Sequence, residues 1–543
     1  SAPAMRTRAL RLFVLGWALV ATAGCASLPP PPDKPVSHAL PAHHTTPLGR
    51  LAQAQAPVAG MSGFRLLVSG EEAFATLSTL ADRAEQTLDL QYYLIHSDAS
   101  AYALMQRVRA AADRGVRVRL LLDDLNTSGQ DDGLLALTRH PHIDVRLFNP
   151  FPSGRFSTVS RLLGSLTDFD RINSRMHNKM FVADNALAVT GGRNVGDTYF
   201  LRNPDSNFLD VDLIVAGPNV RALSRIFDRF WNHPLAYPVA ALVDSPPSEM
   251  GVPAGLGPSA PVAPTAGLGA TGVVQLARDS AMPVGPSPSD RAPAPAHQFP
   301  HELAQGQLRL IWAPSAVLAD RPSKLELEGE SVVAPAPDAV ASVDRLMASA
   351  REELVLITPY LVPGPSQMAM FRALRRQGVQ VRILTNSLAT TDAPAVHVGY
   401  VRHRKAMLRE GIELYELRTR IKEQRRNRLG AFGSSLASLH AKVLVVDGRT
   451  SLVGSMNLDP RSAKLNSEMG LVVNSPILAS QLLQVYQDVR SNSYEVSLDD
   501  RGRLRWRYQD GDRLTELHDE PDASLWLKLS LKLMAPFAPD ELL

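Results

Sequence analysis

Residues 177–194 read HNKMFVADNALAVTGGRN, and residues 440–457 read HAKVLVVDGRTSLVGSMN. In both stretches a His is followed by a Lys two residues later, an Asp seven residues later and an Asn 17 residues later. The shared positions are His177, Lys179, Asp184 and Asn194 in the first copy, and His440, Lys442, Asp447 and Asn457 in the second. This agreement in residue type and spacing indicates an internal duplication. The chain is therefore predicted to contain two copies of one structural unit.

The residue types of the doubled pattern suit chemistry on a phosphodiester. Side chains alternate between the two faces of a strand, so a His-x-Lys sequence on a strand puts an imidazole and an ammonium on one face. Two Lys and two Asn can neutralise phosphate oxygens, while two His can supply a nucleophile and an acid. We expect the substrate phosphate to be bound by Lys179, Asn194, Lys442 and Asn457.

No metal and no cofactor are expected at this site. The sequence shows no carboxylate cluster around His177 or His440 of the kind that holds Mg²⁺, and a Lys is a poor neighbour for a metal ion. The single cysteine, Cys25, excludes both an intrachain disulfide and a zinc site built from several thiolates.

The sequence on either side of each motif is also repeated. Helix-like and strand-like segments alternate in the same order in the two halves: residues 74–85, 88–95, 101–114 and 116–122 in the first, and 340–350, 354–360, 368–377 and 379–384 in the second. Such alternation is typical of the α/β class. We therefore expect two similar α/β/α lobes that form one pseudo-twofold unit, with the active site between them and complete within one chain.

The doubled motif resembles the paired HKD motifs of the phospholipase D superfamily, over about residues 60 to 495. The first half is most similar to the bacterial C-type cardiolipin synthases. That similarity is carried by Asp123-Asp124-Leu125 and by residues 146–151 (RLFNPF), 175–179 (RMHNK) and 191–197 (GGRNVGD). The lobes are thus expected to be of the phospholipase D type.

The resemblance implies a two-step transfer through a covalent phosphohistidine. One His attacks phosphorus, and the other protonates the leaving alcohol and then activates the incoming alcohol or water. His177 is expected to be the nucleophile and His440 the acid and then the base, with the swapped assignment left open.

Four carboxylates are further candidates for the site. The resemblance implies that Asp210 and Glu468 hydrogen-bond the histidines and fix their tautomers; surface acids near strand ends are the alternative. Asp184 and Asp447 belong to the catalytic motif, but an Asp directly after a strand commonly forms a turn, so we expect structural support from them.

The predicted function is a phosphatidyltransferase that makes cardiolipin from phosphatidylglycerol and a second phospholipid. A phospholipase D hydrolase that releases phosphatidic acid is the alternative, and a phosphodiester nuclease is less favoured. Phospholipids and a membrane surface are the expected partners. No nucleic acid is expected, because the sequence has no interleaved aromatic and basic residues of the kind that stack on bases.

The N-terminal region resembles a lipoprotein signal. Arg6, Arg8 and Arg11 precede an apolar run over residues 12–20, and small residues lead to Cys25. Residues 1–25 are thus predicted to be a signal peptide that ends in lipidation of Cys25, which would anchor a periplasmic enzyme in a bacterial cell envelope. Two alternatives for this region stay open: an ordinary signal peptide and a marginal membrane anchor.

The expected domain boundaries follow from composition and from the repeat. They are a Pro-rich tether over 26–60, an N-terminal lobe over 61–238, a disordered Pro/Ala/Gly-rich linker over 239–303, a C-terminal lobe over 304–498 and a tail over 499–543. In the tail, residues 525–534 (LWLKLSLKLM) fit both a helix and a strand. This segment could contact a membrane or pack on the second lobe.

Overall fold

The computed structural model describes residues 28, 30–41, 44–54, 60–151, 169–243, 301–303, 305–325, 339–419 and 436–534. The predicted signal peptide with Cys25, most of the predicted linker and the end of the predicted tail lie outside the described residues. Across the described ranges, no helix has both the length and the apolar character needed to cross a bilayer.

The first lobe is built on a nine-stranded sheet. In spatial order its strands are β10 (Ala236–Pro238), β4 (Ile143–Phe148), β3 (Arg117–Asp123), β2 (Thr87–Tyr92), β6 (Met180–Ala183), β7 (Leu187–Gly191), β9 (Asp212–Ala216), β1 (Ser62–Leu67) and β11 (Ile311–Ala313). Strands β2, β3 and β4 are parallel, whereas the other neighbours pair antiparallel.

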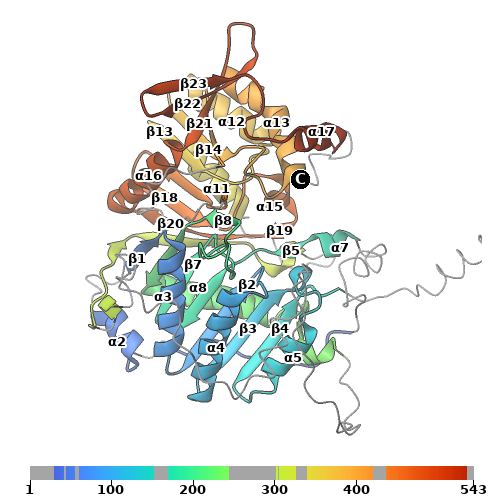
Figure 1. Cartoon of the computed structure of the whole chain (residues 1–543). Coiled ribbons are helices and arrows are strands. Elements are labelled where there is room, and N and C mark those ends of the chain that lie inside the picture. Colours follow the sequence, from blue (N-terminus) through green and yellow to red (C-terminus); the bar gives the residue numbers. More distant parts are fainter. Residues whose placement is uncertain are drawn as a thin grey trace, which may run out of the picture.

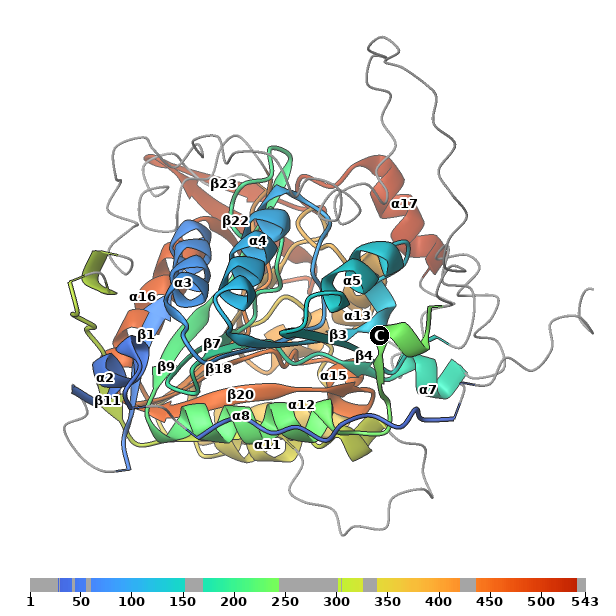
Figure 2. The same ribbon diagram turned by 90° about the horizontal axis from the view of Figure 1, so that it is seen from below.

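Helices cover both faces of this sheet. One face carries α3 (Gly70–Arg83), α4 (Ala99–Asp113) and α5 (Asp131–Thr138), and the other carries α8 (Pro218–Trp231), as Figures 1 and 2 show. The start of α4 is set by Asp98, whose side chain accepts the Ala101 N–H at 3.0 Å. A capping carboxylate satisfies a backbone donor that the first helical turn leaves unpaired.

The second lobe repeats this plan on a ten-stranded sheet. Its strands run in the order β12 (Ser315–Ala319), β20 (Met469–Asn474), β18 (Thr450–Gly454), β17 (Val443–Val446), β13 (Glu353–Ile357), β14 (Gln380–Asn386), β15 (Glu413–Leu417), β21 (Ser493–Leu498), β22 (Leu504–Asp510) and β23 (Arg513–Leu517). Its main helices are α11 (Ala339–Ala348), α12 (Pro365–Arg376), α13 (Pro394–Arg409) and α16 (Pro476–Arg490). The predicted pair of duplicated α/β lobes is confirmed.

Two segments that we placed outside the lobes belong to them. In the predicted tether, α2 (Pro47–Ala54) buries Leu48 and Leu51 in the core of the first lobe, and Ser37 Oγ accepts the Trp231 indole N–H at 2.9 Å. A buried indole N–H needs such a partner, which favours an ordered chain at this point.

In the predicted tail, β22 and β23 extend the second sheet. Strand β11, predicted to lie in the second lobe, instead pairs with β1 of the first sheet.

Two short pairs of parallel strands join the lobes. Strand β5 (Arg175–Met176) pairs with β19 (Asn466–Ser467), and β8 (Ser206–Leu209) pairs with β16 (Leu436–Leu439). Figure 1 shows β5, β8 and β19 at the boundary between the lobes. One hydrophobic core runs through both lobes, so the boundary is a packed interior rather than a hinge.

Candidate active site

Both motif histidines directly follow the strands that join the lobes. His177 follows β5, and its backbone N–H donates to the Ser467 carbonyl of the other lobe at 3.0 Å. His440 follows β16, and its backbone N–H donates to the Leu209 carbonyl at 2.8 Å. Each histidine backbone is therefore fixed by the opposite lobe, and the site lies where the lobes meet.

Each histidine side chain is paired with a carboxylate of the opposite lobe. His177 Nδ1 lies 3.0 Å from Glu468 Oε2, and His440 Nδ1 lies 2.6 Å from Asp210 Oδ2. Glu468 directly precedes β20 (Met469–Asn474), and Asp210 lies two residues before β9 (Asp212–Ala216). Because Nδ1 is held by an acid, Nε2 of each ring is left to act on a substrate.

Burial and neighbouring charge set the ionisation of these pairs. Burial, opposed by Glu468, lowers the pKa of His177 to about 4. Burial and the charge of Lys442 likewise lower the pKa of His440. Burial alone would raise the pKa of Asp210 and Glu468, but the adjacent histidine and lysine outweigh it and lower both. The resting site thus combines neutral imidazoles with ionised carboxylates at neutral pH.

The motif lysines lie deep in the same site. Lys179 Nζ donates to the His177 carbonyl at 2.7 Å, and Lys442 Nζ donates to the His440 carbonyl at 2.5 Å. Burial is the largest cause that lowers the pKa of both ammonium groups, and that of Lys179 falls to about 7. The two lysine ammonium groups are less solvated here than in water, so the negative charge of a bound phosphodiester would stabilise their protonated form.

The motif asparagines are linked to the site through neighbouring residues: Tyr199 lies between Asn194 and His440, and Asn457 lines one small pocket together with Lys442. Asn194 Nδ2 donates to Tyr199 Oη at 3.0 Å, and the Asn457 backbone N–H donates to Ser462 Oγ at 3.1 Å. Both side chains are buried, and across the described part of the chain neither Oδ1 atom has a hydrogen-bond partner.

The motif aspartates lie elsewhere and have a different task. Asp184 accepts the backbone N–H groups of Glu85, Gln86 and Thr87 at 2.8 to 3.2 Å, just where β2 begins. Asp447 does the same for residues 351–353 at the start of β13. Both have a positive φ, near 52° and 51°, which Asp tolerates better than most residues. Both aspartates thus bind the backbone where a strand begins, and structural support stays the role that we expect of them.

Several residues around the site were not predicted. Tyr93 lies edge-on to His177 with ring centroids 5.0 Å apart, and Tyr199 lies edge-on to His440 at 5.3 Å. Ser455 and Ser462 both donate to Glu468. Ser455 takes the place of Gly192 in the second copy of the motif, and this difference between the copies was the available signal.

The described residues contain no group of three or more His, Cys, Asp and Glu side chains that could hold a metal ion. The described side chains of the site offer the chemistry of imidazole, ammonium and carboxylate groups. Two neutral histidines with fixed tautomers, beside two buried lysines, are arranged for nucleophilic and acid–base work on an anionic substrate.

A family model described as "Cardiolipin synthase, PLD-like domain" matches residues 77–231 and 343–490. The chain is 38% identical to cardiolipin synthase C of Escherichia coli (strain K12), over 89% of this chain and 98% of that protein. It is 24% identical to a cardiolipin synthase of Geobacillus kaustophilus (strain HTA426), over 79% of this chain and 66% of that protein.

Among solved structures, phosphatidylserine synthase from Haemophilus influenzae Rd KW20 matches 91% of this chain and 98% of its own, with a TM-score of 0.54 and 13% identity. At that identity the likeness bears on the fold alone. Duplicated α/β lobes that share a doubled His-x-Lys site define a protein of the phospholipase D superfamily. Within that superfamily, the chain belongs to the cardiolipin synthase family with the PLD-like domain.

Proposed function

We propose that the protein is a phosphatidyltransferase that makes cardiolipin from phosphatidylglycerol and a second phospholipid. The observation that carries this proposal is the pair of histidine–carboxylate contacts, His177 with Glu468 and His440 with Asp210, each built across the lobe boundary. The relatives named cardiolipin synthase support the choice of substrate class.

In the first step His177 Nε2 attacks the phosphorus of phosphatidylglycerol. A bond from Nε2 to phosphorus forms, the bond from phosphorus to the glycerol headgroup oxygen breaks, and His440 gives its Nε2 proton to that oxygen. The negative charge of the bound phosphodiester raises the pKa of His440, so substrate binding favours the protonated His440 that acts as the acid. Lys179 and Lys442 balance the charge that develops on the phosphoryl oxygens.

In the second step His440, now neutral, takes the proton of an incoming lipid hydroxyl. The hydroxyl oxygen bonds to phosphorus, the bond from phosphorus to His177 Nε2 breaks, and cardiolipin leaves. Glu468 stabilises the positive imidazole ring while it carries the phosphatidyl group, and Asp210 does the same for the protonated acid. Water in place of the lipid hydroxyl would give phosphatidic acid.

The proposal is tested with purified protein in liposomes of phosphatidylglycerol, with and without phosphatidylethanolamine. Cardiolipin and phosphatidic acid are measured for the wild type, for His177→Ala and His440→Ala, and for His142→Ala as an exposed control. Cardiolipin that is lost in both motif variants and kept in the control is expected. Phosphatidic acid alone would make the protein a hydrolase, and activity on DNA alone would make it a nuclease.

We also propose that α17 (Leu525–Met534) lies on the bilayer that holds the substrates. This helix packs against α13 at the edge of the second lobe (Figure 1), yet Leu525, Trp526 and Leu533 are 86%, 76% and 62% exposed. Positions 525, 529 and 533 are four residues apart, so these leucines share one face with the adjacent Trp526. An exposed apolar helix face with a Trp is typical of interfacial helices.

The start of α17 is tied to the strand that leads to the active site. Asp522 accepts a hydrogen bond from Thr419 Oγ1 at 2.9 Å, and the Thr419 carbonyl accepts the Ala437 N–H of β16 at 3.1 Å. A bilayer in contact with α17 would therefore lie on the side of the second lobe from which β16 runs to His440. Anchoring through a lipidated Cys25 in the cell envelope, with a periplasmic enzyme, remains part of the same proposal.

A further inference from the structure

The second lobe carries a hydrogen-bonded pair, Tyr360 and Asp392, near the active site. Tyr360 Oη donates to both carboxylate oxygens of Asp392 at 2.9 Å. Tyr360 is half-buried and Asp392 is exposed, so the carboxylate is the member of the pair that faces solvent. Across the described ranges, this phenol is the one hydrogen-bond donor to Asp392. A carboxylate has about four lone-pair sites, so Asp392 can accept further hydrogen bonds.

The backbone holds Tyr360 next to the second motif. The following residue, Leu361, forms a parallel bridge with Leu458, which directly follows the motif Asn457. Burial, together with the charge of Asp392, raises the pKa of Tyr360 well above its usual value. The phenol therefore keeps its proton at neutral pH and orients the carboxylate as a hydrogen-bond donor.

The loop that leads from β14 to this carboxylate is fixed to the strand that leads to His440. Asn386, the last residue of β14, exchanges two hydrogen bonds of 2.9 Å with the backbone of Leu439. Farther along the loop, the Thr390 carbonyl accepts a hydrogen bond from Ser438 Oγ. The position of the loop carboxylate is therefore set by the two residues that directly precede the motif histidine.

The charge of Asp392 acts on the groups that are expected to do the chemistry. Burial lowers the pKa of both His440 and Lys442, and the negative charge of Asp392 opposes that lowering in each. His440 and Lys442 are buried, whereas Asp392 is exposed. Asp392 is therefore an exposed anion near the buried imidazole that we expect to handle the headgroup oxygen.

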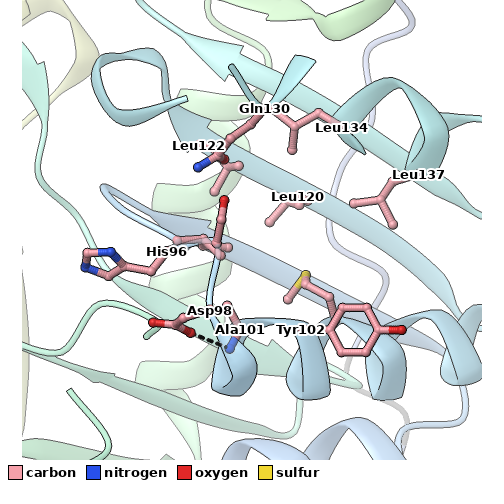
Figure 3. Close-up of a pocket in the computed structure, with 12 residues that line it drawn as sticks. His96, Asp98, Ala101, Tyr102, Leu120, Leu122, Gln130, Leu134 and Leu137 are labelled. Carbon is pink, nitrogen blue, oxygen red and sulfur yellow. Dashed lines mark hydrogen bonds between the residues drawn. The ribbon is translucent and has the colours of Figure 1, made fainter. Parts of the chain in front are cut away.

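The matching positions of the first lobe, which the structure also describes, lack this pair. Counted from the matching backbone hydrogen bonds after β2 and β13, Leu94 takes the place of Tyr360. Counted from the matching threonine hydrogen bonds after β3 and β14, Gly129 takes the place of Asp392. A carboxylate does follow β2, but it is that of Asp98, which caps α4 (Figure 3). The pair thus breaks the pseudo-twofold symmetry on one side of the site.

We propose that Asp392, oriented by Tyr360, accepts a hydrogen bond from the headgroup that leaves or enters at His440. A carboxylate repels a phosphate but attracts a hydrogen-bond donor, and both a glycerol hydroxyl and an ethanolamine ammonium are such donors. The inference rests on the proposed function, in which His440 protonates the headgroup oxygen. The pair then selects headgroups that carry a hydrogen-bond donor over headgroups that carry none.

The test compares headgroup release from phosphatidylglycerol, phosphatidylethanolamine and phosphatidylmethanol, each in micelles of a nonionic detergent. The methyl headgroup has no hydrogen-bond donor. Asp392→Ala should lower kcat/KM for the first two lipids about tenfold relative to phosphatidylmethanol, because a hydrogen bond to a charged group is lost. Asp500→Ala, at an exposed position of the same lobe, is the matched control and should leave these ratios unchanged.

Two further variants sharpen the result. Asp392→Asn keeps an acceptor oxygen but loses the charge, so it should cost an ammonium headgroup about tenfold and a hydroxyl headgroup about threefold. Tyr360→Phe should lower the same ratios about threefold, because the neutral hydrogen bond that orients the carboxylate is lost.

An equal loss for all three lipids in Asp392→Ala would mean that the carboxylate acts only through its charge on His440. That outcome, or no loss for any lipid, would overturn the proposal. Headgroup release precedes the choice between a lipid hydroxyl and water, so the test does not depend on transfer to a lipid. Release without cardiolipin synthesis would remove only the transferase, whereas no release by the wild type would remove the proposed function and this inference with it.

Discussion

At the scale of single residues, each motif histidine of the site contacts a carboxylate that belongs to the opposite lobe. Glu468 accepts from His177 and also from Ser455 and Ser462, so its orientation is fixed by three side chains. Asp210 contacts His440 at 2.6 Å and also accepts the backbone N–H of Val211. A carboxylate held in this way fixes the tautomer of its histidine and stabilises the imidazolium.

Replacing either acid by its amide should therefore slow the chemical step. For Glu468→Gln and Asp210→Asn we expect kcat to fall about 100-fold to 10,000-fold with little change in KM, because the charge that stabilises the imidazolium is lost. Initial rates over a range of lipid surface concentrations measure this. Asp205→Asn, at an exposed position, is the control. Rates within a factor of about two of the control would show that the acids only support the fold.

The pH dependence of kcat/KM should report the nucleophile and the general acid of the free enzyme. The active form needs a neutral His177, with a pKa of about 4, and a protonated His440, whose pKa burial and Lys442 lower below the usual histidine value. Activity should thus fall as pH drops through about 4, and on the alkaline side it should fall before Lys179, with a pKa of about 7, loses its proton. Lys179→Arg keeps its charge to higher pH and should leave this alkaline limb in place. A limb that moves upward in Lys179→Arg would assign that ionisation to Lys179 and not to His440.

At the scale of elements, the buried Asp184 fixes the start of β2, and Asp447 fixes the start of β13. Asp184→Ala should lower the free energy of unfolding by about 2 to 4 kcal/mol, because several backbone N–H groups lose a charged acceptor. Denaturant titration measures the loss, and Asp184→Asn, which keeps the preference for positive φ, should lose less. An activity per folded molecule far below that of the wild type would contradict the structural role.

The exposed face of α17 should carry membrane binding. Removing apolar surface with Trp526→Ala and Leu533→Ala together should weaken binding to phosphatidylglycerol vesicles by at least about tenfold. Vesicle flotation of protein that also carries Cys25→Ser measures this without any lipid anchor. Leu514→Ala removes a leucine that is 61% exposed on β23 and serves as the control. Equal loss in the control would mean that exposed apolar area in general, and not α17, holds the protein to vesicles.

The elements differed in how well the sequence predicted them. Strands such as β2 and β13 are six and five residues long, with helices around them, and their repeated order was readable. Strands β5 and β19 have two residues each and show no periodicity. His177 and Glu468 directly follow those two strands, and His440 and Asp210 directly follow β16 and β8, which have four residues each. The sequence could therefore name Asp210 and Glu468 but not their partners.

At the scale of the whole molecule, the doubled motif was enough to predict two lobes with one site between them. The boundaries of the two lobes were harder to predict, because amino-acid composition does not show which sheet an additional edge strand joins. Residues 34–54 look like a tether by their prolines, yet Lys34, Ser37 and Leu48 contact the first lobe.

The central claim is that phosphatidyl transfer passes through a covalent intermediate on one motif histidine. The measurement that tests it most directly is peptide mass spectrometry of His440→Ala after a short reaction with a phosphatidyl donor whose leaving group needs no acid. A phosphatidyl adduct on the peptide that contains His177, absent in His177→Ala, is the predicted result. No adduct in any variant, or an adduct on a residue other than a motif histidine, would contradict the phosphohistidine mechanism.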